Sequence, residues 1–91
     1  MTTIWKYQLR VTDRQVVALP SGAKILSLQV QYGEPYLWAE VDPSQPLQGH
    51  VFLTFGTGHS LLEARLIEYI GTYQLSGFVW HVYLHVNRES V

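Results

Sequence analysis

The chain has 91 residues, a formal net charge of −1 and no cysteine. This length predicts one domain spanning residues 1–91, and the lack of cysteine excludes disulfides, a thiolate nucleophile and a cysteine-based zinc site. The first residues lack the basic and apolar regions of a signal peptide, and no apolar run approaches the roughly 20 residues that span a bilayer. We therefore expect a soluble cytoplasmic protein with no membrane partner.

The balance of apolar and charged residues points to self-association. Charged residues make up 14 % of the chain, against about 25 % in an average soluble domain, and a domain this small has too little interior for three Trp and six Tyr. The surplus should form an exposed patch that marks an interface, so we expect a homo-oligomer. The basic residues are spread singly, so nucleic acid is not an expected partner, although Lys6, Arg10 and Lys24 could gather on one sheet face.

The first predicted strand runs from Thr3 to Val11, where apolar and polar residues alternate strictly. Its apolar set should face the core: Trp5, Tyr7, Leu9 and Val11. Gln15 to Leu19 is a second, shorter strand, and Pro20-Ser21-Gly22 ends it as a turn.

The next two strands, Ala23 to Tyr32 and Tyr36 to Asp42, form a predicted hairpin around the Gly33 turn. Their expected inward sets are Leu26, Leu28, Val30 and Tyr32 on the first, and Leu37, Ala39 and Val41 on the second. Trp38 then falls on the polar face. It is either an aromatic cover for the strand pair or a subunit contact, and the sequence leaves both interpretations open.

The middle of the chain is expected to leave the sheet and return. Residues 43–49 are predicted as a surface loop, and His50 to Phe55 as a strand. Ser60 to Leu66 is predicted as a helix of about two turns, because Ser60 and Glu63 have the spacing of a capping box.

Ile67 to Leu75 and Phe78 to Val86 form a second predicted hairpin around Ser76-Gly77. Both faces of the last strand are largely apolar or aromatic, which is typical of a central strand or of one that packs against another subunit. Together these elements predict an all-β domain, a small sandwich or partly open barrel of about seven short strands with one short helix.

Nearly the whole chain resembles a family of short bacteriophage and prophage proteins of uncharacterised function. The resemblance rests on six runs of sequence: residues 3–7 (TIWKY), 19–27 (LPSGAKILS), 37–43 (LWA and VDP), 56–59 (GTGH), 69–72 (YIGT) and 78–82 (FVWHV). It implies a phage or prophage context in a bacterial host. By analogy with other small phage proteins, it implies a role against host defence, such as sequestering a nucleotide signal.

The loop Gly56-Thr57-Gly58-His59 is the first candidate binding site. Its glycines let consecutive backbone N–H groups approach a phosphate, Thr57 adds a hydroxyl, and a helix starting at Ser60 would favour an anion. The alternative is a strand-to-helix turn that needs positive φ at both glycines. The pattern matches neither the phosphate loop of nucleotide hydrolases nor the dinucleotide fingerprint.

Aromatic residues supply the other candidates. Tyr32, Tyr36 and Trp38 gather near the Gly33 turn, where they could stack on a base or cap an interface. We predict Tyr36 and Trp38 as further ligand contacts. The predicted subunit contacts are Trp38, Trp80, His81 and Tyr83.

Neither metal binding nor catalysis is expected. His81 and His85 lie roughly 13 Å apart along a strand, too far to share one ion with bonds of about 2 Å. The chain has no nucleophile elbow and no paired-histidine zinc motif. We therefore expect a non-enzymatic protein without a cofactor, which forms homo-oligomers and captures a small anionic or nucleotide-like ligand. The alternative is a module that docks on a host or phage protein through its aromatic patch.

Overall fold

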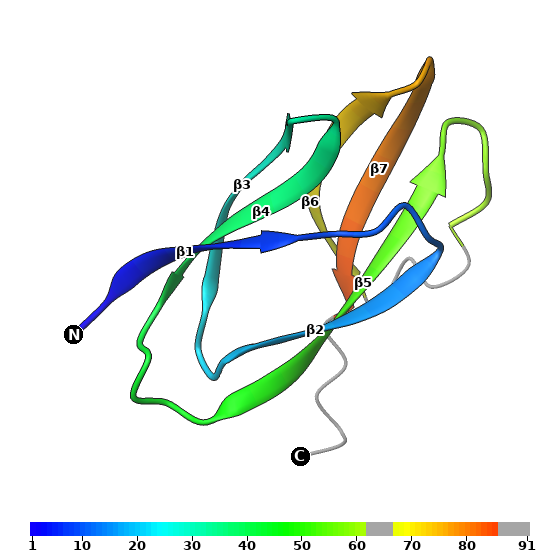
Figure 1. The fold of residues 1–91 in the computed structure, drawn as a ribbon. Coiled ribbons are helices and arrows are strands. Elements are labelled where there is room, and N and C mark those ends of the chain that lie inside the picture. Colours follow the sequence, from blue (N-terminus) through cyan, green and yellow to red (C-terminus); the bar gives the residue numbers. More distant parts are fainter. Residues whose placement is uncertain (62–66, 86–91) are drawn as a thin grey trace.

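The computed structural model describes residues 1–61 and 67–85, in which seven strands form two antiparallel sheets (Figure 1). Sheet A has the order β1-β4-β3 and sheet B the order β2-β5-β7-β6. The strands are β1 (Thr3–Gln8), β2 (Arg14–Pro20), β3 (Lys24–Gln31), β4 (Glu34–Val41), β5 (Leu47–Gly56), β6 (Ile67–Leu75) and β7 (Phe78–His85). The prediction of an all-β, sandwich-like fold is therefore confirmed.

The predicted helix from Ser60 to Leu66 falls mainly on residues 62–66, which lie outside the described residues. The described part of the chain contains no helix.

The predicted start of the fifth strand was wrong, because β5 begins at Leu47 and not at His50. Pairing with β2 extends it, since Leu47 already lies opposite Pro20. Gly49 fits this pairing because a Cβ there would lie 3.0 Å from a methyl group of Val16.

The core lies between the two sheets, and β4 supplies much of it. Leu37, Ala39 and Val41 are at most 1 % exposed, as the alternation predicted. Sheet B contributes Phe52 of β5 and Val82 of β7, both fully buried. The buried core cluster comprises Leu9, Leu19, Leu28, Leu37, Phe52, Tyr73 and Val82.

A β-bulge between Ile25 and Ser27 corrects the predicted inward face of β3. The extra residue, Leu26, is 43 % exposed, whereas Ile25 packs against the core. An inserted residue changes which side chains face inward, because side chains alternate with a period of two. Leu28 is buried as predicted, but Val30 and Tyr32 of the same predicted set are exposed. The first strand ends at Gln8 and not at Val11. Of its predicted inward set, Tyr7 and Leu9 contact the core as expected, whereas Trp5 and Val11 are exposed.

Both predicted hairpins are present, and their turns are of the same type. Tyr32 and Gly33 have φ values of 55° and 77°, and Ser76 and Gly77 have values of 54° and 82°. Positive φ at both central residues is characteristic of the type I′ turn, which suits the right-handed twist of paired strands.

A buried side chain holds the connection between β1 and β2 in place. The Gln15 amide donates to the Arg10 carbonyl oxygen (2.7 Å) and accepts from the Arg10 N–H (2.9 Å).

Candidate functional site

The Gly56–His59 loop closes on itself at the end of β5. The His59 N–H donates to the Gly56 carbonyl oxygen (3.0 Å), and the Gly56 N–H donates to Nδ1 of the His59 ring (3.2 Å). A Cβ at Gly56 would lie 2.9 Å from that ring, so a larger residue there would have to displace the imidazole that packs over the glycine. Gly58 has a φ of 90°, whereas Gly56 is not in the positive-φ region. The loop therefore needs positive φ once, not twice.

This closure changes what the loop offers to an anion. The Gly56 N–H is already bonded to the His59 ring, so it is not part of a row of donors facing a ligand. Because Nδ1 accepts this bond, a neutral His59 carries its proton on Nε2, where it can donate outward. The backbone N–H groups of Thr57 and Gly58 and the Nε2 edge of the His59 ring are the donors of this loop that take no part in its closure. Anion binding at this loop stays a prediction.

His81 joins the loop to the two strands beside it. Its Nε2 lies 2.8 Å from Oγ1 of Thr57, and its Nδ1 lies 3.1 Å from Oγ1 of Thr72, which in turn contacts the hydroxyl of Tyr69. Threonine hydroxyls both donate and accept, so both ring nitrogens are satisfied. In a catalytic triad the third group is a carboxylate that stabilises the imidazolium, whereas here it is a hydroxyl. The described residues contain no group of three or more His, Cys, Asp or Glu that could hold a metal ion.

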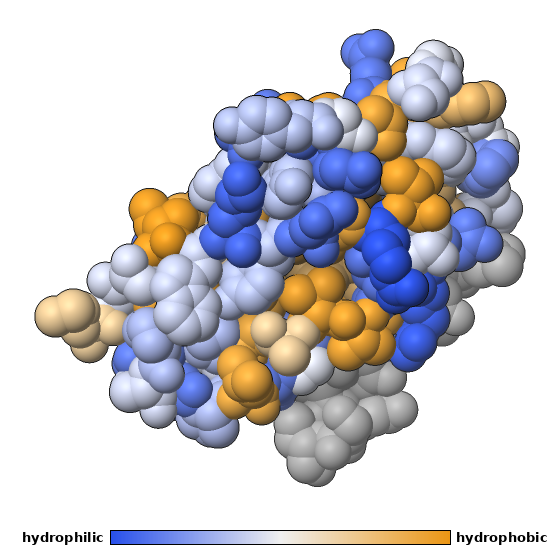
Figure 2. Space-filling view, in the orientation of Figure 1, coloured by the Kyte–Doolittle hydropathy of each residue, from blue (hydrophilic) through white to orange (hydrophobic). Residues whose placement is uncertain are grey.

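The outer face of sheet B is apolar across its two central strands. His81 and Tyr83 alternate with buried Val82, so they point away from the core. The Tyr83 ring makes edge contacts with Phe55 (5.7 Å between centroids) and Tyr69 (5.5 Å). Further apolar side chains on this face are Val16, Val51, Leu53 and Val79. Figure 2 shows hydrophobic side chains gathered among polar ones over the region of β2 and β5.

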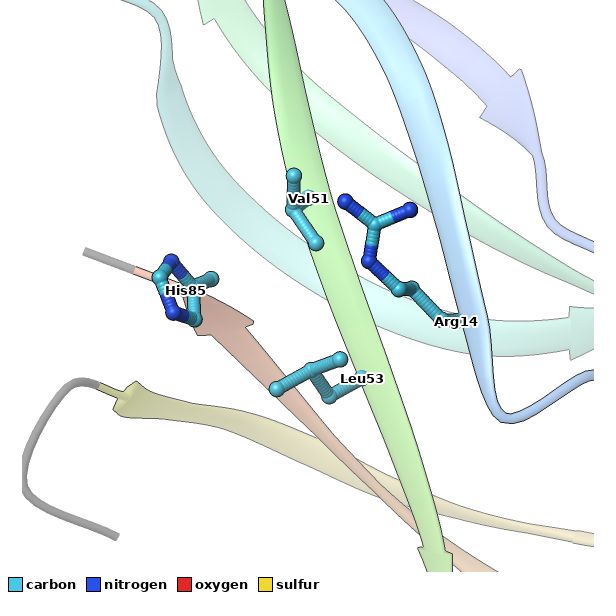
Figure 3. A pocket seen from close by; sticks show the side chains of 4 residues that line it. All are labelled: Arg14, Val51, Leu53 and His85. Atoms are coloured by element: carbon cyan, nitrogen blue, oxygen red, sulfur yellow. The ribbon is translucent and has the colours of Figure 1, made fainter. Parts of the chain in front are cut away.

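Arg14 borders a pocket on this face. Of the outward-facing strand residues described in sheet B, it alone carries a formal charge. The pocket has a volume of about 290 Å³ and is lined by Arg14 of β2, Val51 and Leu53 of β5, and His85 of β7 (Figure 3). Because β5 lies between β2 and β7, an apolar floor separates a guanidinium from an imidazole. Such a site suits a small ligand with an anionic group and an apolar body.

The outer face of sheet A carries the predicted aromatic cluster with a lysine at its centre. Tyr36 and Trp38 alternate with buried Leu37, and their ring centroids lie 6.2 Å apart. The Lys6 ammonium lies 4.4 Å from the Tyr36 centroid, 5.8 Å from that of Trp38 and 5.7 Å from that of Tyr32. The sequence suggested that Lys6 could share a sheet face with other basic residues but did not predict its contact with these rings, although Lys6 and Trp38 are direct partners in the pairing of β1 with β4.

The model of one protein family, described as a domain of unknown function (DUF7352), matches residues 1–91. The chain belongs to this family. No curated protein and no solved structure matches it. Membership in DUF7352 indicates neither a source organism nor an activity, so the phage context and the expected function stay predictions. Among the described residues of this DUF7352 domain, no helix is long and apolar enough to cross a membrane.

The predicted ligand contacts do not form one group in this DUF7352 domain. Tyr36 and Trp38 lie on the outer face of sheet A, whereas the Gly56–His59 loop continues β5 of sheet B. The predicted subunit contacts are also divided. His81 and Tyr83 share the outer face of sheet B, Trp38 lies on sheet A, and Trp80 packs against the core. One contact surface can therefore include His81 and Tyr83 without Trp38.

The His59 ring should make Gly56→Ala costly in the DUF7352 domain. The added methyl group displaces the ring and breaks its hydrogen bond to the Gly56 N–H, so we expect a loss of about 1 kcal/mol in the free energy of unfolding. In a His59→Ala background the same change should cost close to nothing, because the ring is gone. Urea denaturation of the four proteins of this double-mutant cycle measures the difference. Additive effects of the two substitutions would contradict the packing of His59 on Gly56.

Proposed function

We propose that this protein is a non-enzymatic binding module that pairs with a second copy through the outer face of sheet B and holds a small anionic ligand at the boundary. The observation that carries the proposal is the composition of this face, in which β5 and β7 present apolar and aromatic side chains and β2 presents a single cation beside a pocket. When one face of an antiparallel sheet is solvated, its side chains are normally polar. This face is therefore suited to being covered.

A second copy of the chain is the partner that the charges favour. In a two-fold dimer each surface meets itself, so a surface rich in one sign of charge would repel its twin. The outer face of sheet B avoids this, because its only formal charge among the described strand residues is on β2, at one edge of the sheet. Two such faces can pack about 10 Å apart, as stacked sheets do. Arg14 then lies towards the rim of the contact.

The Arg14 pocket supports the ligand part of the proposal. A guanidinium binds phosphate or carboxylate groups through two parallel hydrogen bonds. The Val51 and Leu53 floor can take the apolar part of the same ligand, such as a base. The Gly56–His59 loop borders the same face, because Thr57 is bonded to His81. A nucleotide-holding dimer also agrees with the anti-defence role that the resemblance to phage proteins implies.

The second candidate is a module that docks on a host or phage protein. The observation that favours it is the chain of ring contacts from Phe55 through Tyr83 to Tyr69. Tyrosine is enriched among the few clustered residues that supply most of the binding energy of a protein interface.

A thermal-shift and titration screen with cyclic nucleotides, linear nucleotides and dinucleotides tests the proposed ligand binding. We expect one of them to stabilise the fold by about 2.7 kcal/mol at 100 times its Kd. Arg14→Gln should weaken binding about 10- to 150-fold, which corresponds to losing a charged hydrogen bond of about 1.5–3 kcal/mol. Arg10→Gln is the matched control, since Arg10 lies outside the pocket and outside the strands. A screen without any stabilising nucleotide would favour the docking module. Equal weakening by both substitutions would contradict a specific site at Arg14.

A further inference from the structure

The outer face of sheet A carries a cluster that the proposed function does not use. We call it the ring platform and define it as Lys6, Tyr32, Tyr36 and Trp38. The Lys6 ammonium lies within 6 Å of all three ring centroids and also donates to the Gln31 side chain. The three rings are thus held around one cation by contacts from two strands and a turn.

Tyr32 occupies a conformation that costs free energy. Its φ is 55°, in a turn position where Gly, Asn and Asp are preferred. A residue with a Cβ pays about 1–2 kcal/mol in this region, and at 87 % exposure the Tyr32 ring recovers little of that by burial. A bulky side chain kept in such a position is a reason to look for function. Here the turn directs the Tyr32 ring towards Lys6.

Two classes of ligand do not fit this face, single-stranded nucleic acid and quaternary ammonium ions. Lys6 and Lys24 are matched by Glu34 and Glu40 on the same side of the sheet, so the face has no net charge. Single-stranded nucleic acid needs a positive groove along its phosphates as well as rings for its bases. Quaternary ammonium ions bind at the centre of aromatic cages, and in the ring platform Lys6 already lies there.

The polar groups around the platform are mostly side-chain amides. Each amide offers both donors and an acceptor, as does a pair of hydroxyl groups on a ligand. On the outer face the neighbours of the rings are Gln8, Ser27, Gln29 and Gln31. A ligand that meets both the rings and the amides must combine an apolar face with many hydroxyl groups, and it must carry no charge.

We propose that the outer face of sheet A binds a neutral saccharide chain. The C–H face of a sugar ring packs on Tyr32 and Trp38, whose ring centroids lie further from the Lys6 ammonium than that of Tyr36, because weakly positive C–H hydrogens are attracted to the negative face of an aromatic ring. The amides and the Lys6 ammonium bind the hydroxyl groups. Lys6 also holds the rings in place through its contact with the Tyr36 ring at 4.4 Å.

This site is independent of the proposed dimer, because it lies on the other sheet. The two inferences nevertheless fit together. A dimer that pairs through sheet B would carry two ring platforms facing away from each other. Two sites on one particle strengthen binding to a polymer without any new contact.

The test is native affinity electrophoresis in gels that contain a soluble β-glucan, a soluble α-glucan or a galactomannan, with a fluorescent 20-mer of deoxythymidine as the nucleic-acid probe. We expect at least one polysaccharide to retard the protein. Trp38→Ala should weaken that retardation at least tenfold, and Phe78→Ala, at an exposed aromatic residue of sheet B outside the proposed dimer contact, should leave it unchanged. Tyr32→Ala should weaken it several-fold, and at 87 % exposure this change does not put folding at risk.

Three results would overturn the proposal. The first is a protein that none of the three polysaccharides retards. The second is equal weakening by Phe78→Ala and Tyr32→Ala, which would show that the ring platform is not the binding face. The third is salt-sensitive binding of the deoxythymidine 20-mer that Trp38→Ala abolishes, in which case the platform serves nucleic acid.

Discussion

Phe52→Ala should remove about 3–5 kcal/mol from the free energy of unfolding, the range for truncating a buried aromatic side chain. Phe52 is fully buried and belongs to the core cluster between the sheets, where it pairs with both Gln15 of β2 and Leu84 of β7. A domain of this length holds only about 5–14 kcal/mol in total. The substitution should therefore leave the fold marginal at room temperature.

Urea denaturation at a fixed protein concentration measures this effect. Phe78→Ala provides the matched control, since Phe78 is 62 % exposed at the start of β7 and loses the same atoms. We expect the control to cost less than about 1 kcal/mol, as is usual away from the core. Similar losses in the two variants would contradict the placement of Phe52 between the sheets.

The sequence was sufficient to predict the elements whose pattern is local. Leu37, Ala39 and Val41 follow a strict period of two, and this alternation alone places them in the core. The turn at Ser76-Gly77 was likewise identified from two residues, because Gly suits the positive φ of a type I′ turn. In these places the chemistry of neighbouring residues decides the structure.

The predictions of inward-facing residues failed where the pairing of distant strands decides which side chains face the core. The extra residue in β3, Leu26, cannot be found from alternation, because the bulge exists only relative to β4. A second bulge, between Tyr69 and Gly71, exists only relative to β7. It turns Gly71 inward, where a Cβ would lie 3.2 Å from Leu28 of the opposite sheet. Neither bulge can be located until the strands are paired, and the close approach of Gly71 to Leu28 appears only when the two sheets are packed together.

The candidate sites also have one feature that the sequence could predict and others that it could not. The excess of apolar residues predicted an exposed patch, and the outer face of sheet B provides one. The partners of single residues could not be predicted, because they depend on register. His81 meets Thr72 because the two lie opposite each other in the β6–β7 pairing, and Lys6 meets Trp38 through the β1–β4 pairing. Function on this fold therefore has to be argued from faces of sheets.

Tyr83→Arg should convert the proposed dimer into a monomer. The Tyr83 ring lies on the outer face of sheet B between Phe55 and Tyr69, at the centre of the proposed contact. An arginine there would place an unpaired charge from each copy into an apolar interface, at a cost of about 3 kcal/mol or more. Because about 1.4 kcal/mol is a factor of ten, the dimer should weaken more than 100-fold.

Light scattering coupled to gel filtration at tens of micromolar measures this change. The wild type should have about twice the chain mass of 10.4 kDa, and Tyr83→Arg should have the mass of one chain. Tyr36→Arg adds the same charge to the outer face of sheet A, so it should leave the dimer intact. A wild-type mass of one chain would refute the proposed self-association. Dissociation by Tyr36→Arg but not by Tyr83→Arg would move the contact to the ring platform, because the added charge disrupts only the face that is buried.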